Sequence, residues 1–353
     1  MNRRWICSDV WMDILPSFDH AQLGLKMALI SDRFDVLVDA HFDGKSELTI
    51  WRTIEIRKDE GPKPKMSILI DGRNHFVEFP LSDRQMPNKI CFKDLHIHYI
   101  DHSVITFLHA KKRFFDRRGT KLEVFVYPID ANVQPIWDVF FREIWPIFAT
   151  NIRQLGFNNA DHLDNLRSRI SPTILTDLDQ MNSIDSGALF PDGIADDGPN
   201  ATAGQALSKW LHTPSKDGQP KRLYRNNFLD PLNLEWVDNF KETFLRATTS
   251  VSYHIHLCIH VEPMPIEPFE LVNERTKEKL TLKHSKEYNE SVYNWLLQRC
   301  PIGETAKAAV KLEHRANPSV NLNNITFDLW SFSESIGPLS LPAEEEKEEK
   351  ADE

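Results

Sequence analysis

The sequence predicts an α+β or α/β protein, in which a short helical module is followed by a much larger region of strands and helices. Three observations support this prediction. Residues 6–42 hold three short segments with apolar residues at helical spacing. Two strand-like runs meet across Asp71-Gly72, a dipeptide typical of hairpin turns. From residue 91 onward, strand-like runs alternate with helix-like runs, as they do in βα assemblies.

A chain of 353 residues has room for a sizeable core, divided into two or three units. We expect a helical module first, then one large associated domain, and then a tail. The predicted boundaries are 1–46 for the module, 47–337 for the domain (47–90 a β-hairpin unit, 91–262 irregular βα repeats, 263–337 a β-rich cap) and 338–353 for a disordered acidic tail.

Each segment of the helical module has a plausible start. Ser8 is the expected N-cap of the first helix, Asp19 precedes Gln22 by three residues as in a capping box, and Ser31 opens the third helix. Helices this short bury too little surface to be stable alone, so we expect them to lean on a partner or on the rest of the chain. The apolar residues that repeat at helical spacing are Val10, Trp11, Ile14, Leu15, Leu23, Met27, Ile30, Phe34, Leu37, Val38 and Phe42.

An acidic residue with apolar neighbours opens this pattern at Asp9, apolar positions follow at Ile14-Leu15 and Leu23, and Ile30 to Phe34 close it as apolar-Ser-x-Arg-aromatic. On these residues the segment resembles an F-box, the module that binds the Skp adaptor of cullin-RING ubiquitin ligases. It departs from that family where Ile6-Cys7 stands in place of the usual Leu-Pro. The resemblance implies an adaptor-binding set of Val10, Trp11, Ile14, Leu15, Leu23, Ile30 and Phe34. The alternative is that these side chains only pack against the next domain.

The resemblance continues beyond the helical module. Runs such as ELTIWRTIEIRK, IHYIDHSVITFLHA, FELVNERTKEKLTLK and LLQRCPI look like those of the F-box families expanded in plant-parasitic nematodes. The match covers most of the chain. For this associated region it implies an architecture and no defined chemistry.

The strand-like runs from residue 91 to 262 are spaced by about 25 to 30 residues, which favours an arc resembling leucine-rich repeats. Their alternation predicts one apolar face and one open polar face. The cap is expected to contain the strand-like runs FELVNE, KLTLKH, YNWLLQRC and ITFDLWSF. The polar face supplies our candidate target-binding residues, which are His96, His98, Glu123, Phe125, His254, His256 and His260.

The formal net charge is −10, and the tail from Ala343 to Glu353 contributes half of it with seven acidic residues against two lysines. Nucleic-acid binders concentrate Lys and Arg, so we expect no nucleic-acid partner. We also expect no membrane partner, because no apolar run has membrane length and no apolar segment follows the basic residues at the N-terminus. These features favour a cytoplasmic or nuclear protein.

Metal chemistry is the main alternative for the histidines. His254, His256, Cys258 and His260 alternate on one strand face, and imidazole and thiolate suit zinc. Side chains on one face of a strand are about 6.6 Å apart, so only two or three of them could converge on one ion. His96-x-His98 is typical of metallohydrolases, but the further ligands these enzymes need are missing. We therefore predict no metal, no cofactor and no catalytic residue.

These expectations combine into one functional hypothesis. The chain is predicted to be a non-catalytic substrate-receptor subunit of a Skp–cullin–F-box ubiquitin ligase, which bridges the Skp adaptor and cullin complex to an unknown target protein. The alternatives are an interaction scaffold without ligase association and, less favoured, a metal-dependent hydrolase.

Overall fold

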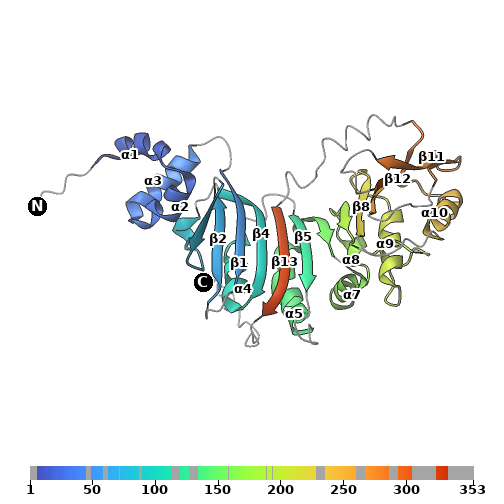
Figure 1. The fold of residues 1–353 in the computed structure, drawn as a ribbon, viewed down its shortest axis with the longest axis horizontal. Helices are drawn as coiled ribbons and strands as arrows, with labels where there is room; N and C mark the ends of the chain where they lie inside the picture. The colour runs from blue at the N-terminus through green and yellow to red at the C-terminus, as the bar shows by residue number, and fades with distance from the viewer. Residues whose placement is uncertain are drawn as a thin grey trace, which may run out of the picture.

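A computed structural model gives the fold of the chain. It describes residues 6–44, 49–58, 63–70, 72–86, 90–112, 120–126, 134–157, 159–187, 189–192, 194–227, 235–259, 267–285, 293–303 and 323–332. The expected mixture of helices and strands is confirmed, since these residues form helices and one large mixed sheet (Figure 1). The predicted acidic tail, 338–353, lies outside the described residues.

The sheet has 13 strands in the order β10-β11-β12-β9-β8-β7-β6-β5-β13-β4-β1-β2-β3. From β9 to β1 all neighbouring strands are parallel, whereas β2 and β3 at one end and β10, β11 and β12 at the other are antiparallel. The parallel strands are β1 (Thr49–Arg57), β4 (Ile90–Ile100), β13 (Asn323–Phe332), β5 (Thr120–Val126), β6 (Ile152–Gly156), β7 (Ser183–Asp185), β8 (Lys221–Asn227) and β9 (Tyr253–Ile259). The antiparallel strands are β2 (Lys65–Ile70), β3 (Arg73–Val77), β10 (Phe269–Asn273), β11 (Glu278–Ser285) and β12 (Tyr293–Pro301).

Strands β5 to β9 lie side by side in chain order, and helices connect them. Right-handed crossovers that all step in one direction place their helices on one face of a parallel sheet. Helix α4 packs on β4 and α7 contacts β5, in agreement with this rule. The helices after the N-terminal module are α4 (His102–Ala110), α5 (Gln134–Val139), a π-helical turn (Phe140–Ile144), α6 (Trp145–Phe148), α7 (Ala160–Arg169), α8 (Ile174–Asp177), α9 (Ala203–His212) and α10 (Glu235–Arg246).

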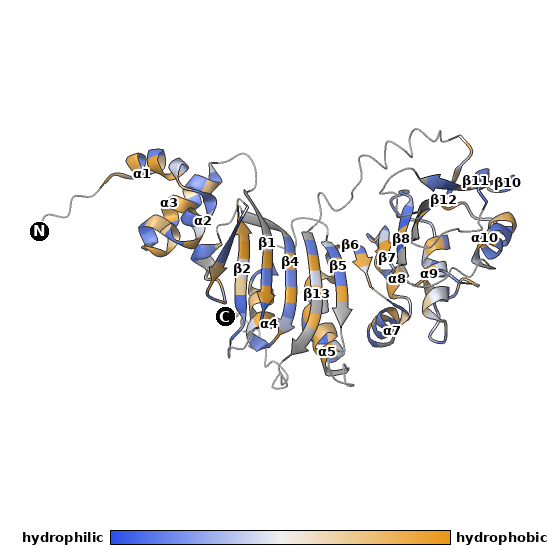
Figure 2. Ribbon diagram, in the orientation of Figure 1, coloured by the Kyte–Doolittle hydropathy of each residue, from blue (hydrophilic) through white to orange (hydrophobic). Residues whose placement is uncertain are grey.

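The strands separate apolar from polar residues by their two-residue period. Figure 2 shows apolar and polar bands alternating along β4, β13 and β5. The helix-covered face is almost fully buried and carries Leu95, Ile97, Ile325, Phe327, Leu122, Val124, Leu155, Leu223, Ile255 and Leu257. The polar residues of the same strands therefore share the opposite face.

The position of β13 differs from our expectation that residues 263–337 form one terminal cap. Only β10, β11 and β12 lie at that end, whereas β13 is inserted between β4 and β5 and pairs in parallel with both. The insertion buries Ile325, Phe327 and Leu329, each at most 1% exposed. Both edges of β13 are thereby hydrogen-bonded, which a strand at the end of the sheet could not achieve.

The hairpin unit expected at 47–90 is continuous with the large sheet. Strands β2 and β3 pair antiparallel across a turn in which Gly72 has φ of 78°, a conformation that glycine adopts without strain. Strand β1 pairs antiparallel with β2 on one side and in parallel with β4 on the other. These strands therefore extend the sheet and do not form a separate layer.

The N-terminal module contains α1 (Ser8–Ile14), a 3₁₀ turn (Leu15–Ser17), α2 (His20–Leu25), a second 3₁₀ turn (Met27–Leu29) and α3 (Asp32–Asp43). The predicted caps of α2 and α3 are present: Asp19 accepts a bond of 2.6 Å from the Gln22 amide, and Ser31 accepts one of 3.4 Å from the Phe34 amide. The prediction for α1 was wrong, since Cys7 is its N-cap and gives no side-chain bond.

Candidate interaction surfaces

The first candidate surface is an apolar ridge on the N-terminal module, formed by Val10, Trp11, Ile14, Ile30 and Phe34. Val10 is 45% and Ile30 63% exposed, while Trp11, Ile14 and Phe34 are partly buried. The Trp11 and Phe34 rings meet edge to face with centroids 4.8 Å apart, which joins α1 to α3. The ridge thus retains apolar surface after the helices have packed together.

Two residues of the predicted adaptor-binding set do not belong to this ridge. Leu15 and Leu23 have no exposed surface, because they lie in the core of the module with Val38 and Phe42. A partner could reach them only if the helices separated. The expectation that they contact an adaptor is therefore corrected: they support the ridge from beneath.

The path of the chain into α1 is held by a side chain from α3. The Arg33 guanidinium donates a hydrogen bond to the carbonyl oxygen of Ile6. In the F-box pattern a proline would restrict the backbone near this point. In this chain, which has Ile6-Cys7 there, the Arg33 bond ties the Ile6 carbonyl to α3.

The second candidate surface is the polar face of the sheet. Strand register aligns its side chains in rows, of which two cross most of the sheet. The first polar row contains Glu55, His96, Thr326, Glu123, Gly156, Asp185, Tyr224, His256, Leu296 and Lys283. The second polar row contains Asp94, Asn324, Lys121, Gln154, Ser183, Arg222, His254, Gln298 and Thr281.

The predicted target-binding residues are divided between distant strands of this face. His96 and His98 lie on β4, and the His98 imidazole is 3.4 Å from the Glu55 carboxylate. His254 and His256 lie on β9, and five strands separate β9 from β4. At about 4.8 Å per strand the two pairs are roughly 29 Å apart, so they cannot contact one small ligand. The side chain of Phe125 and all of His260 lie outside the described residues.

At the centre of the face, two carboxylates approach each other across a glycine. We call Glu123, Gly156, Asp185 and Tyr224 the carboxylate patch. A Cβ atom on Gly156 would lie 2.8 Å from the Glu123 Cγ, so the Glu123 side chain occupies the space over the glycine. Glu123 accepts from the Thr326 hydroxyl at 3.3 Å and pairs with the Lys121 ammonium at 2.7 Å.

The Asp185 carboxylate has no such basic partner among the described residues. Among the described residues it has no ion pair, and its hydrogen bond from the Gly187 amide is long at 3.4 Å. Burial is the largest effect and raises the pKa of its carboxyl group; the hydrogen bond from the Gly187 amide opposes it, and the weaker effects of the Glu123 and Lys121 charges raise and lower the pKa, respectively. The carboxylate patch therefore holds two acidic groups for one lysine.

Uncharged rings adjoin Asp185. The Tyr224 and His256 rings stack with centroids 4.7 Å apart and an interplanar angle of 12°. Burial, with help from the Arg222 and Lys283 charges, lowers the pKa of His256 to about 4, so this imidazole is neutral at pH 7. His254, with its pKa also lowered to about 4 by burial, accepts a hydrogen bond of 3.2 Å from the Gln298 amide.

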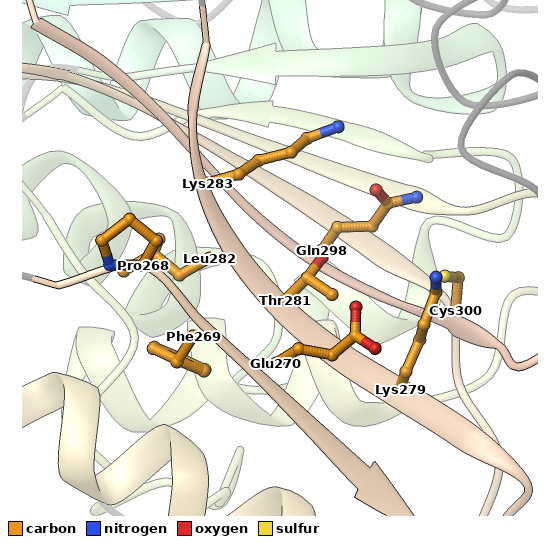
Figure 3. Close-up of a pocket in the computed structure, with 9 residues that line it drawn as sticks. All are labelled: Pro268, Phe269, Glu270, Lys279, Thr281, Leu282, Lys283, Gln298 and Cys300. Carbon is orange, nitrogen blue, oxygen red and sulfur yellow. The ribbon is translucent and has the colours of Figure 1, made fainter.

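A pocket of about 370 Å³ lies on the same face near the β10–β11 end of the sheet (Figure 3). Thr281 and Gln298 form part of its wall, with Lys283 on one side and Glu270 and Lys279 on the other. Its charged groups are of both signs, so the pocket does not select a ligand by charge alone.

The sequence did not reveal the carboxylate patch. Glu123 was predicted to lie on the polar face, but Gly156, Asp185 and Tyr224 were not considered. Strand β7 has only three residues, too few for the alternation that marks a strand. Little in the sequence marked this strand, because Asn182, Ser183 and Ile184 before Asp185 include one apolar residue.

Where side chains are described, no group of three His, Cys, Asp or Glu residues is arranged to hold a metal ion. In the part of the chain that the structure describes, no helix has the length and apolar character needed to cross a membrane. No protein-family model, curated protein or solved structure matches this chain. A function for this chain is therefore inferred from the two surfaces.

Proposed function

We propose that the chain is a non-catalytic substrate receptor of a Skp–cullin–F-box ubiquitin ligase. The N-terminal ridge would bind the Skp adaptor, and the polar face of the sheet would bind the target. The observation that carries the proposal is the exposure of Val10 and Ile30, 45% and 63%, within helices whose sequence resembles an F-box. Exposed apolar side chains beside partly buried aromatic ones are typical of protein interfaces.

The packing of the N-terminal module supports a ridge that faces the adaptor. Its core residues face inward, and Arg84, from the short 3₁₀ turn Asp83–Gln85, forms ion pairs with Asp32 and Asp35 of α3. The Arg84 and Asp35 groups are 3.7 Å apart. These contacts join α3 to the turn that follows β3, while the ridge keeps its accessible surface.

The arrangement suits a bridging role. In Figure 1 the three helices of the module lie at one end of an elongated molecule, and β11, β12 and α10 lie at the other. A receptor of this shape would hold its target at a distance from the adaptor. Ubiquitin transfer would then be promoted by proximity, because the bridge raises the effective concentration of the target near the ligase.

Co-purification with the Skp adaptor tests this function. The test variant is Val10→Asp with Ile30→Asp, which places charges on exposed positions and leaves the core of the module intact. Val36, which is 67% exposed on α3 and outside the F-box pattern, supplies the matched control Val36→Asp. We expect the wild type and the control to retain the adaptor and the double variant to lose it. Failure of the wild type to bind, or full binding by the double variant, rejects the proposal.

The replacement of Leu-Pro by Ile6-Cys7 favours a second candidate, an interaction scaffold that does not join a ligase. It would use the polar face in the same way. The same co-purification separates the two functions, because a scaffold would fail to retain the adaptor while still binding its partner.

A further inference from the structure

We propose that the carboxylate patch binds an arginine side chain of the target polypeptide. This inference rests on the proposed function, in that it takes the polar face as the target surface. Four features of the patch support it: its charge, the unpartnered polar atoms beside it, its aromatic wall and its lack of metal-ligand geometry.

The charge of the patch favours a second cation near Asp185. The Glu123 side chain lies over Gly156, which is in register with Asp185 on the next strand, and Lys121 pairs with Glu123 at 2.7 Å. Arg222 lies in the second polar row and forms no ion pair with Asp185 in the described part of the chain. A positive group from a binding partner would therefore balance the negative charge of the Asp185 carboxylate.

Two buried polar atoms beside the patch lack a hydrogen-bond partner among the described residues. They are the Gln154 Oε1 and the Ser183 Oγ atoms, on side chains that are 6% and 1% exposed. Gln154 precedes Gly156, and Ser183 precedes Asp185, by two residues on the same face. Both atoms can accept hydrogen bonds, but they have almost no accessible surface, so a ligand that carries several donors would reach them only after side chains of the patch moved aside.

The aromatic wall distinguishes arginine from other cations. The stacked Tyr224 and His256 rings adjoin Asp185, and neither ring is charged at pH 7. A planar guanidinium can stack on such a ring while its fork of N–H groups donates to a carboxylate. An ammonium group has no flat face, and a metal ion would need three suitable ligands, which the described residues do not bring together.

The experiment uses three tripeptide probes and the purified full chain without adaptor. The probes are acetyl-glycyl-arginyl-glycine amide and its lysine and citrulline analogues, with binding followed by NMR shifts of the His256 ring. We expect the arginine peptide to bind more tightly than the citrulline peptide by on the order of tenfold, because citrulline keeps the shape and loses the charge. The lysine peptide should fall between them.

Asp185→Asn should abolish the preference for arginine over citrulline. The matched control is Glu270→Gln, which removes a carboxylate at the far end of the same face and should leave the preference unchanged. Tyr224→Leu should reduce the advantage of arginine over lysine. Equal binding of the arginine and citrulline peptides, or an arginine preference that survives in Asp185→Asn, overturns the proposal. Because no adaptor is present, these results are independent of whether the N-terminal ridge binds Skp.

Discussion

A buried ion pair between β11 and β12 offers a quantitative test of the structure. Glu278 is 0% and Arg299 1% exposed. One carboxylate oxygen of Glu278 accepts from the Arg299 Nε and a terminal nitrogen at 3.0 and 2.6 Å, and the other accepts from the Ser250 hydroxyl and the Val251 amide at 2.8 Å each. The Arg299 guanidinium also donates to the Thr249 carbonyl at 2.8 Å. The pair thus joins two strands to the segment before β9.

Glu278→Gln preserves the shape of the side chain and removes its charge. The Arg299 guanidinium then stays buried without a counter-charge, which costs about 3–5 kcal/mol of the free energy of unfolding. With a slope of about 3 kcal/mol per molar urea, this loss lowers the urea midpoint by about 1–1.7 M. The fluorescence of the nine tryptophans reports the transition.

The matched control is Glu274→Gln, at a neighbouring glutamate whose pair with Lys277 is about three-quarters exposed. Exposed pairs contribute at most about 1 kcal/mol, so this variant should unfold close to the wild type. A double variant, Glu278→Met with Arg299→Met, should lose less stability than the two single changes added together. A loss below about 1 kcal/mol for Glu278→Gln would show that the pair is solvated and would refute the structural argument.

Three further outcomes follow from the described side chains. Asp185→Asn should slightly raise the melting temperature at pH 7, because burial raises the pKa of this carboxyl group and its ionised form opposes folding. Calorimetry should find no gain in melting temperature below about pH 3.8, where the carboxyl group is protonated in both the folded and the unfolded protein. His212, His254 and His256 have pKa values lowered by burial from 6.5 to about 4. Their stabilising contribution is complete above pH 6.5 and declines as the pH falls towards 4, so unfolding curves should show a loss of a few kcal/mol over this range, and constant stability would contradict these environments. Leu23→Ala removes a fully buried side chain and should cost about 2–5 kcal/mol in unfolding of the N-terminal module, measured by hydrogen exchange; a cost near zero would mean that the module is not packed as described.

Local sequence patterns were informative where a cap, turn or strand depends only on residues close to it in the chain. The caps at Asp19 and Ser31, the turn at Gly72 and the alternation in β9 were all readable, because each depends on neighbours within a few residues. The cap at Ser8 was misread. Its amide lies inside the helix, and Cys7 has the extended backbone of an N-cap.

Long-range pairing was not readable in the same way. Strand β13 has the apolar alternation of any half-buried strand, and nothing within it indicates that β4 and β5 are its neighbours. Strand β7 is too short to show a period, so the sequence did not mark Asp185 as the last residue of a strand. The carboxylate patch depends on both of these placements.

The sequence by itself determined the polar and apolar faces of the strands and the spacing of the N-terminal helices, because side-chain periodicity is a property of the backbone. Only the tertiary structure decided which polar residues meet. Register brings Glu123 to Gly156 and Asp185, and packing exposes Ile30 while it buries Leu23. Both depend on contacts between segments far apart in the chain, and such contacts are set by the burial of the whole sheet.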